Sequence, residues 1–330
     1  MYRDMVLTRA FDTQATALQR QGKLALWPPS LGQEAAQVGS AHAVSAEDWV
    51  FPSYREHGVL QARGVDLTES LALFRGTDHG GWDTERPRTH LYTLVVGAQA
   101  LHAVGYAMGM ALDGAPGAAV VYLGDGATSQ GEFSEALVWA ASAQAPVLFF
   151  IQNNGWAIST PAATQARVPL ARRGEGFGIP GERVDGNDVA ACYDVTAAAL
   201  ETVRAGQGPR IIEALTYRMG PHTTSDDPSR YRTHDQEAEW ATRDPVARAR
   251  AALAASGLAD QAFFDEADAA GARLAERARE RCAALEAPPF GAFFDWAYAT
   301  PHRLVAEERA ARERESGVMA PALALAGAGL

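Results

Sequence analysis

Two polar side chains, Asp125 and Asn154, each follow an apolar stretch with the composition of a buried β-strand. A tight Gly-Asp-Gly turn and a helical segment lie between the two stretches, which is the order of a strand-turn-helix-strand unit. In an open parallel sheet the ligand crevice lies outside the carboxyl ends of the strands. We therefore expect the Asp125 carboxylate and the Asn154 amide to face the same crevice.

A carboxylate and an amide oxygen suit a hard cation. Mg²⁺ prefers oxygen ligands, commonly takes one or two protein carboxylates, and leaves its other positions to water and phosphate oxygens. Gly124 and Gly126 would let the backbone turn sharply and approach a diphosphate, whose charge the following helix N-terminus favours. A helix-capping aspartate and an Asn-Asn-Gly turn would explain the same residues without a ligand, and a short motif alone does not exclude that alternative.

Longer segments of the chain extend this pattern. They read GDGATSQGEF, QNNGWAISTP, FGIPGERVDGNDV and YRMGPHTTSDDPSRYR. The Gly-Asp-Gly turn, the helix, the apolar strand and the Asn-Asn pair, with Asn154 placed 29 residues after Asp125, resemble the cofactor motif of thiamine diphosphate enzymes. Together, and in this order, the segments resemble the alpha subunit of the decarboxylating component of 2-oxo acid dehydrogenase complexes. The resemblance covers roughly Tyr2 to Leu258.

The resemblance implies an α/β fold, the parallel-sheet thiamine diphosphate-binding fold of the diphosphate and Mg-binding type. Helices would cover both faces of the sheet, and a helical C-terminal extension would follow. The chain length of 330 residues fits two domains, or one large α/β domain with an appendage. We expect an α/β domain over residues 1–234, the helical extension over 235–315, and a disordered tail over 316–330, where polar periodicity is lost.

The resemblance also implies the residues that hold Mg²⁺ and thiamine diphosphate. The metal ligands would be Asp125, Asn154 and the main-chain carbonyl of Trp156. Tyr54 and Arg55 would contact the diphosphate, and an arginine fork suits bidentate phosphate binding. Further cofactor contacts near the Gly-Asp-Gly turn and the second strand would come from Gly124, Gly126, Ala127 and Gln152.

The main chain around Leu94 and Val96 would hold the aminopyrimidine ring of the cofactor, again by resemblance. Related branched-chain enzymes have a serine-rich version of this segment that also binds potassium. In this chain the aligned positions, Thr93, Val95 and Ala98, have largely lost the side-chain oxygens that a potassium ion needs.

His222 lies in a polar loop directly after the apolar segment RIIEALTYR, which we expect to end beside the crevice. A histidine in a loop is usually just solvated, but histidine can move protons near neutral pH. In the resembled family this residue contacts the cofactor and takes part in passing the acyl group to a lipoyl arm. We therefore predict a catalytic role for His222.

Composition excludes several other functions. The net charge of −11 argues against nucleic acid or an anionic membrane as a partner, because both need a basic face. Lys23 is the only lysine, so neither a Schiff-base mechanism nor a Walker A loop has its lysine in a plausible place. Cys192 and Cys282 form no metal or redox spacing and read as free thiols of a reducing compartment. With no signal peptide or apolar span visible, we predict a cytoplasmic protein.

The function that these features predict is the alpha chain of a thiamine diphosphate-dependent 2-oxo acid dehydrogenase. The segments NNGWAISTP, RVDGNDV and HTTSDDPSRYR look closer to enzymes for branched-chain 2-oxo acids such as 3-methyl-2-oxobutanoate. The segment VGAQ looks closer to pyruvate enzymes, so a pyruvate or acetoin dehydrogenase remains an alternative.

The sequence supplies only enough alternating elements for one α/β sheet, whereas a thiamine enzyme needs a second domain to bury the aminopyrimidine. The resembled family solves this with a beta subunit, in a complex of two alpha and two beta chains that passes acyl groups to a lipoyl acyltransferase. We therefore expect this chain alone to be inactive. A self-sufficient thiamine lyase or transketolase would need the missing domain. A non-catalytic Mg-phosphate binding protein would not need His222 or the Tyr54-Arg55 pair.

Overall fold

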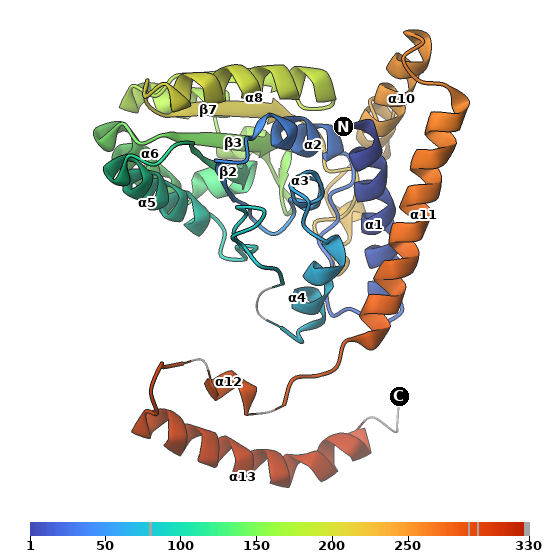
Figure 1. Ribbon diagram of the computed structural model, residues 1–330. Coiled ribbons are helices and arrows are strands. Elements are labelled where there is room, and N and C mark those ends of the chain that lie inside the picture. Colours follow the sequence, from blue (N-terminus) through green and yellow to red (C-terminus); the bar gives the residue numbers. More distant parts are fainter. Residues whose placement is uncertain (79–80, 290, 296, 327–330) are drawn as a thin grey trace. The chain divides into compact units, whose positions relative to one another are not determined.

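Parallel strands in the order β1-β2-β3-β7-β6 form the central sheet of a compact unit that spans Met1–Ala284 (Figure 1). The computed structural model describes residues 1–78, 81–289, 291–295 and 297–326, with side chains described through residue 316. The strand bounds are β1 Trp49–Phe51, β2 Ala119–Gly124, β3 Val147–Asn153, β6 Gly181–Asp185 and β7 Arg210–Leu215. Strands β2 and β3 are buried along almost their whole length, as is typical of a parallel sheet covered on both faces.

Helices cover both faces of this sheet, as predicted (Figure 1). Alternate residues of a strand point to opposite faces. Val121 and Phe149 therefore pack with α5 and α6 on one face, whereas Tyr122 and Phe150 pack with α2 and α8 on the other. The helix bounds in this unit are α1 Tyr2–Arg20, α2 Glu34–Ala43, α3 His57–Ala62, α4 Leu71–Arg75, α5 Ala98–Asp113, α6 Gly131–Ala143, α7 Ala162–Gln165, α8 Val189–Arg204, α9 His234–Ala241, α10 Pro245–Ala255 and α11 Gln261–Ala284.

Local signals in the sequence place several of these elements. The Asp188 carboxylate accepts hydrogen bonds from the N–H groups of Ala190 at 3.0 Å and Ala191 at 3.1 Å, and so caps the N-terminus of α8. A second, two-stranded sheet pairs β4 (Trp156–Ala157) with β5 (Thr160–Pro161) in antiparallel fashion just after β3. This short hairpin brings the chain back over the end of the central sheet.

Helix α11 packs along α1, and the two helices lie side by side in Figure 1. The Phe264 ring meets the Tyr2 ring edge-on at 5.3 Å, and Ala267 and Val6 complete the contact. The segment from residue 235 is helical, as predicted. Its helices α9, α10 and α11 nevertheless belong to the compact unit that begins at Met1, because α1 needs the apolar face of α11 to cover it.

The second unit spans Leu285–Leu330 and contains α12 (Ala292–Asp295) and α13 (Arg303–Ala326). Within it, the Arg309 guanidinium donates a 2.8 Å hydrogen bond to the Asp295 carboxylate. The backbone of α13 extends to Ala326 through most of the predicted tail, and residues 327–330 lie outside the described residues. Among the helices that the structure describes, none is both long and apolar enough to cross a bilayer.

Candidate functional site

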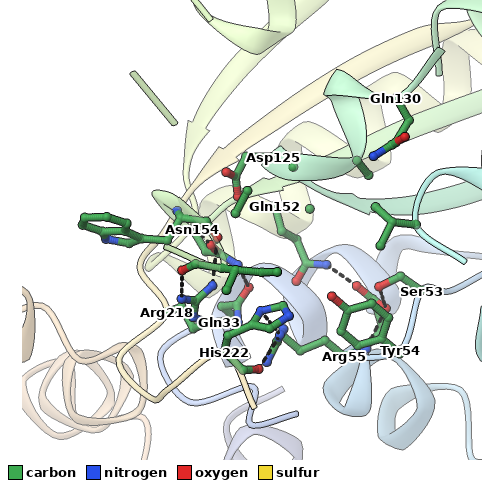
Figure 2. A pocket seen from close by; sticks show the side chains of 18 of the residues that line it. Gln33, Ser53, Tyr54, Arg55, Asp125, Gln130, Gln152, Asn154, Arg218 and His222 are labelled. Atoms are coloured by element: carbon green, nitrogen blue, oxygen red, sulfur yellow. Dashed lines mark hydrogen bonds between the residues drawn. The ribbon is translucent and has the colours of Figure 1, made fainter. Parts of the chain in front are cut away.

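Asp125 and Asn154 follow the ends of two neighbouring strands. Gly124, the last residue of β2, stands opposite Gln152 of β3 in the register of the sheet. The next residue, Asp125, opens a short 3-10 helix, and Asn154 directly follows β3. Both side chains are buried and line the same cavity (Figure 2). The sheet register therefore brings together the two residues that the sequence predicted to share a metal ion.

The Asp125 carboxylate is 2% exposed, and this burial raises its pKa. Hydrogen bonds oppose the shift: Gln165 donates from Nε2 to Oδ2 at 3.0 Å, and the backbone N–H of Asn154 also favours the charged form. Gln165 in turn accepts a 3.2 Å bond from the Ser129 hydroxyl, which fixes the orientation of its amide. A cation beside a buried carboxylate stabilises the ionised form, so this site suits a metal ion.

Gly126 allows two segments to approach closely. A Cβ atom at this position would lie 2.8 Å from the Cβ of Ala157, which no packed structure accommodates without a shift. The chain passes from β2 into a 3-10 helix between the two glycines, but this change of direction needs no conformation that is reserved for glycine. Gly124 has φ −81°, an ordinary value, and Gly126 is not among the glycines with positive φ. Gly126 is needed for space beside the β4 strand.

Gln152 belongs to a buried polar network beneath the cavity. It donates from Nε2 to the Glu56 carboxylate at 2.7 Å and accepts at Oε1 from Gln37 at 2.9 Å. Glu56 also accepts a 2.8 Å bond from the Ser53 hydroxyl. Burial raises the pKa of Glu56, and these hydrogen bonds offset part of that rise. Gln152 thus joins the strand end to the loop that carries Arg55.

Arg55 joins three loops at the opposite wall of the cavity. Its guanidinium, 6% exposed, donates to the Pro29 carbonyl at 2.6 Å and to the His222 carbonyl at 2.8 Å. It also lies 5.4 Å from the centre of the Tyr54 ring, within cation-π range. The predicted Tyr54-Arg55 pair and the predicted catalytic histidine therefore lie together, although 167 positions separate Arg55 from His222 (Figure 2).

His222 is a neutral hydrogen-bonding group in this structure. Burial, followed by the positive charges of Arg55 and Arg218, lowers its pKa to about 3. Arg55 can only donate, so its 3.2 Å contact with Nδ1 makes that nitrogen the acceptor and places the ring proton on Nε2. The backbone N–H of His222 donates to Asp226 at 2.8 Å and fixes the loop. The imidazole therefore offers an N–H donor rather than a titrating base near neutral pH.

Arg218 holds the segment that follows Asn154. Its guanidinium donates to the carbonyls of Trp156 at 2.8 Å and Ile158 at 2.7 Å, and burial lowers its pKa to about 10. The Trp156 carbonyl, which the sequence predicted as a metal ligand, thus already accepts one hydrogen bond. A carbonyl oxygen has a second lone pair, which leaves one acceptor position for a metal ion.

The cavity measures about 230 Å³, and several of the residues that line it have a buried polar atom without a hydrogen-bond partner among the described residues. They are Gln33 Nε2, Gln99 Oε1 and Arg218 Nε. Buried polar groups are normally paired, so these atoms fit a polar ligand. Within the described part of the chain, no three His, Cys, Asp or Glu side chains cluster to bind a metal by themselves. A Mg²⁺ ion here would therefore need further oxygen ligands from a bound phosphate compound, and the diphosphate of thiamine diphosphate could supply them.

Most of the predicted site residues line this one cavity: Tyr54, Arg55, Val96, Gly124, Asp125, Gly126, Ala127, Gln152, Asn154, Trp156 and His222. Leu94, predicted to contact the cofactor through its main chain, is 54% exposed and is not among the lining residues. Sequence reasoning missed other residues of the wall: Gln33, Ser53, Glu56, Gln99, Gln130, Ala157, Ile158 and Arg218. Glu56 and Arg218 adjoin recognised segments, whereas Gln33 carries no local signal of a ligand.

Comparison with known proteins agrees with this arrangement. Residues 2–288 match the family described as Dehydrogenase E1 component. The chain is 46% identical over 291 residues to the 3-methyl-2-oxobutanoate dehydrogenase subunit alpha of Mycobacterium tuberculosis, covering 88% of this chain and 79% of that protein. It is 43% identical over 256 residues to the pyruvate dehydrogenase E1 component subunit alpha of Staphylococcus epidermidis and of Staphylococcus aureus, covering 77% of this chain and 69% of those proteins.

The family match spans the whole sheet, the cavity and the helices that cover them. The relatives align over 88% and 77% of this chain, and most of the predicted cofactor residues meet in one cavity, where the unpaired polar atoms of the lining residues suit a phosphorylated ligand. The chain therefore belongs to the dehydrogenase E1 component family, and it is a thiamine diphosphate-dependent 2-oxo acid dehydrogenase of that family.

Proposed function

We propose that this chain is the alpha subunit of a branched-chain 2-oxo acid dehydrogenase, which decarboxylates acids such as 3-methyl-2-oxobutanoate and transfers the acyl group to lipoamide. The observation that carries the proposal is the 46% identity to a 3-methyl-2-oxobutanoate dehydrogenase subunit alpha over 291 residues, which is 88% of this chain. Pyruvate dehydrogenase is the second candidate, because relatives of that name are 43% identical.

The sheet wall of the cavity would hold the metal. Asp125 would supply a charged oxygen, Asn154 an amide oxygen and Trp156 a carbonyl oxygen to Mg²⁺. The backbone could approach the diphosphate closely at Gly124, Gly126 and Ala127, because none of these residues has a side chain larger than a methyl group. The ion would neutralise phosphate charge and fix the position of the cofactor.

The loop wall would orient the cofactor and the acyl group. Arg55 and Tyr54 would contact the diphosphate, and His222 would present its Nε2–H to the reacting groups. Bound thiamine diphosphate supplies the electron sink that accepts the bonding electrons as the carboxylate leaves as CO₂. A neutral His222 can donate a hydrogen bond to a developing negative charge without first losing a proton, which is the role that its environment supports.

The proposal includes a beta subunit. One parallel sheet is present in the described part of the chain, together with a two-stranded hairpin, and Leu94 and Val95 near the cavity mouth are 54% and 71% exposed. A companion chain would cover them and complete the aminopyrimidine site, in a complex of two alpha and two beta chains that delivers acyl groups to a lipoyl acyltransferase. A cytoplasmic location, consistent with two buried free thiols, remains part of the proposal.

Reconstitution tests the proposal. The chain would be purified alone and together with a beta-type chain from the same source, and both would be assayed with Mg²⁺, thiamine diphosphate and either 3-methyl-2-oxobutanoate or pyruvate. We expect turnover only from the pair, with the higher kcat/KM for the branched acid. Substantial turnover by the single chain would exclude the two-chain proposal, and a preference for pyruvate would support the second candidate.

A further inference from the structure

Two glutamines lie one turn apart at the start of α2 and differ in how they are paired. Gln33 is 1% exposed and Gln37 is fully buried. The Gln37 amide is satisfied within the protein: Nε2 donates to the Arg55 carbonyl at 3.0 Å and to Gln152 at 2.9 Å, and Oε1 accepts from the Gly58 N–H at 2.8 Å. Gln37 is therefore a structural residue of the network beneath the cavity.

The Gln33 amide is only half satisfied. Its Oε1 accepts a 3.0 Å hydrogen bond from Asn154 Nδ2, whereas its Nε2 has no partner among the residues that the structure describes. Gln33 lines the cavity, and Figure 2 shows it beside Asn154. An unpaired, buried N–H donor loses much of its interaction with water, so it is normally retained only where a ligand can accept its hydrogen bond.

The contact with Gln33 also determines which atom Asn154 presents to the cavity. The amide nitrogen of Asn154 donates to Gln33, and its Oδ1 accepts a 3.3 Å bond from the N–H of Trp156. Both contacts require the same amide orientation, with nitrogen toward Gln33 and oxygen on the other side. Rotating the Asn154 amide by half a turn would place its Nδ2–H₂ group against the backbone N–H of Trp156, and two donors cannot form a hydrogen bond with each other.

The backbone around Gln33 is rigid enough to hold this geometry. The Gln33 N–H donates to the Ser30 carbonyl at 3.0 Å, and the Ser30 N–H donates to the buried carboxylate of Asp12 at 3.0 Å. The next residue along the chain, Glu34, accepts from the N–H of Gly32 at 2.9 Å and pairs with Arg9. The loop before α2 is thus fixed on both sides of Gln33.

We propose that Gln33 is a positioning residue for the cofactor. Its Oε1 keeps the Asn154 amide turned so that Oδ1 is available to Mg²⁺, and its free N–H donates to a diphosphate oxygen. The diphosphate is the favoured acceptor because Gln33 contacts Asn154, a predicted metal ligand, directly, and Mg²⁺ held there would take its remaining ligands from water and phosphate oxygens. Arg218, whose Nε is also unpaired among the described residues, lines the same cavity and adds positive charge. This inference rests on the proposed function.

Two substitutions test the roles of Gln33. Gln33→Met keeps the shape of the side chain but removes both the donor and the acceptor. Gln33→Glu keeps an acceptor for Asn154 and replaces the free donor with an oxygen that repels phosphate. The binding of Mg²⁺ with thiamine diphosphate, and of Mg²⁺ with inorganic pyrophosphate, would be measured by calorimetry on the complex of this chain with its beta chain. We expect both variants to weaken both ligands by about 10- to 100-fold, the cost of a hydrogen bond to a charged group.

Thermal unfolding of the cofactor-free complex distinguishes positioning from structure. Gln37→Met is the matched comparison, because it removes an amide from the same helix one turn later. We expect Gln37→Met to lower the cofactor-free Tm clearly more than Gln33→Met, because Gln37 makes three hydrogen bonds within the protein and Gln33 makes one. An equal loss of Tm in the two variants, without weaker ligand binding by Gln33→Met, would show that Gln33 is only structural.

The remaining outcomes separate this inference from the proposed function. If the wild-type complex binds no Mg²⁺ and thiamine diphosphate, the proposed function itself is wrong. If the wild type binds them and both Gln33 variants bind equally well, the positioning role is wrong. Weaker binding of thiamine diphosphate with unchanged binding of pyrophosphate, or a change confined to the KM of the 2-oxo acid, would exclude the diphosphate contact.

Discussion

The two walls of the cavity are positioned by different parts of the structure. On the sheet wall, Asp125 and Asn154 follow β2 and β3, whose backbone hydrogen bonds set their relative positions. On the loop wall, Arg55 and His222 lie 167 positions apart and meet only through side-chain hydrogen bonds. A substitution on the sheet wall should therefore change the chemistry and leave the geometry intact. A substitution on the loop wall should change the geometry itself.

The largest effect is expected from Asp125→Asn on the sheet wall. The substitution keeps the size of the side chain but removes its negative charge. Metal-ion stabilisation is worth several kcal/mol, so we expect kcat/KM of the reconstituted complex to fall by about 1000-fold or more. The cofactor-free Tm should stay close to that of the wild type, because β2 is unaffected. Normal activity with unchanged Mg²⁺ dependence would contradict the metal site.

Arg55→Lys tests the loop wall. Lysine keeps the positive charge but cannot reach the Pro29 and His222 carbonyls together with a planar fork. Losing one or two charged hydrogen bonds should lower kcat/KM by about 10- to 100-fold. If the geometry is the cause, a double variant with His222→Ala should be clearly less impaired than the product of the two single effects. Independent effects would show that Arg55 does not position His222.

Gln165→Leu gives a smaller effect on the sheet wall. It removes the N–H donor that Asp125 Oδ2 accepts and leaves the carboxylate in place. Loss of a hydrogen bond that orients a metal-binding group should weaken Mg²⁺ affinity by about tenfold. Titration of activity with Mg²⁺ measures this change, and saturating Mg²⁺ should restore most of the rate. A deficit that Mg²⁺ cannot overcome would place Gln165 outside the metal site.

The smallest expected effect is a pH dependence of the free energy of unfolding. It comes from His57, a buried histidine two positions after Arg55 of the loop wall. Its ring lies between the Tyr92 hydroxyl at 2.6 Å and the Pro28 carbonyl at 3.0 Å, and burial lowers its pKa to about 3. The unfolded chain protonates this histidine below about pH 6.5, whereas the folded chain does not. Its contribution to stability is therefore present above pH 6.5 and is lost as the pH falls toward 3.

Chemical unfolding at several pH values measures this contribution. We expect a loss of about 1 kcal/mol between pH 6 and pH 5 from His57. His57→Gln should flatten the pH dependence relative to the wild type, whatever its stability at pH 7. If hydrogen exchange at pH 5 increases at the ends of β2 and β3 before it increases near Pro28 and Tyr92, the contrast between the two walls is wrong.

The sequence predicted the sheet wall well because its signals are local. Apolar runs ending in Asp125 and Asn154 indicate buried strands, and a parallel sheet places their ends at one edge. The polar networks were not predictable in this way. Gln33 and Gln165 resemble ordinary surface glutamines in the sequence, and their partners Asn154 and Asp125 lie 121 and 40 positions away. Only the folded chain shows that the Gln33 amide is buried and that both amides point at these partners.

The resemblance supplied the loop wall, which local patterns alone could not. Nothing within the segments around Arg55 and His222 shows that they meet. The environment of His222 also differs from the expectation: burial, followed by the charges of Arg55 and Arg218, lowers its pKa to about 3, whereas an isolated histidine would titrate near neutral pH. Arg218, one of these arginines, was visible in a recognised segment, but its contact with the Trp156 carbonyl depends on the fold.

The unpaired polar atoms of the cavity also affect how long the protein survives in a cell. A ligand that satisfies them binds only the folded chain, and at a hundred times its dissociation constant it adds about 2.7 kcal/mol to the stability. Freshly synthesised chains that have not yet met thiamine diphosphate should open more often and be degraded faster by proteases. We therefore expect thiamine starvation of the cells to lower the abundance of this protein as well as its activity.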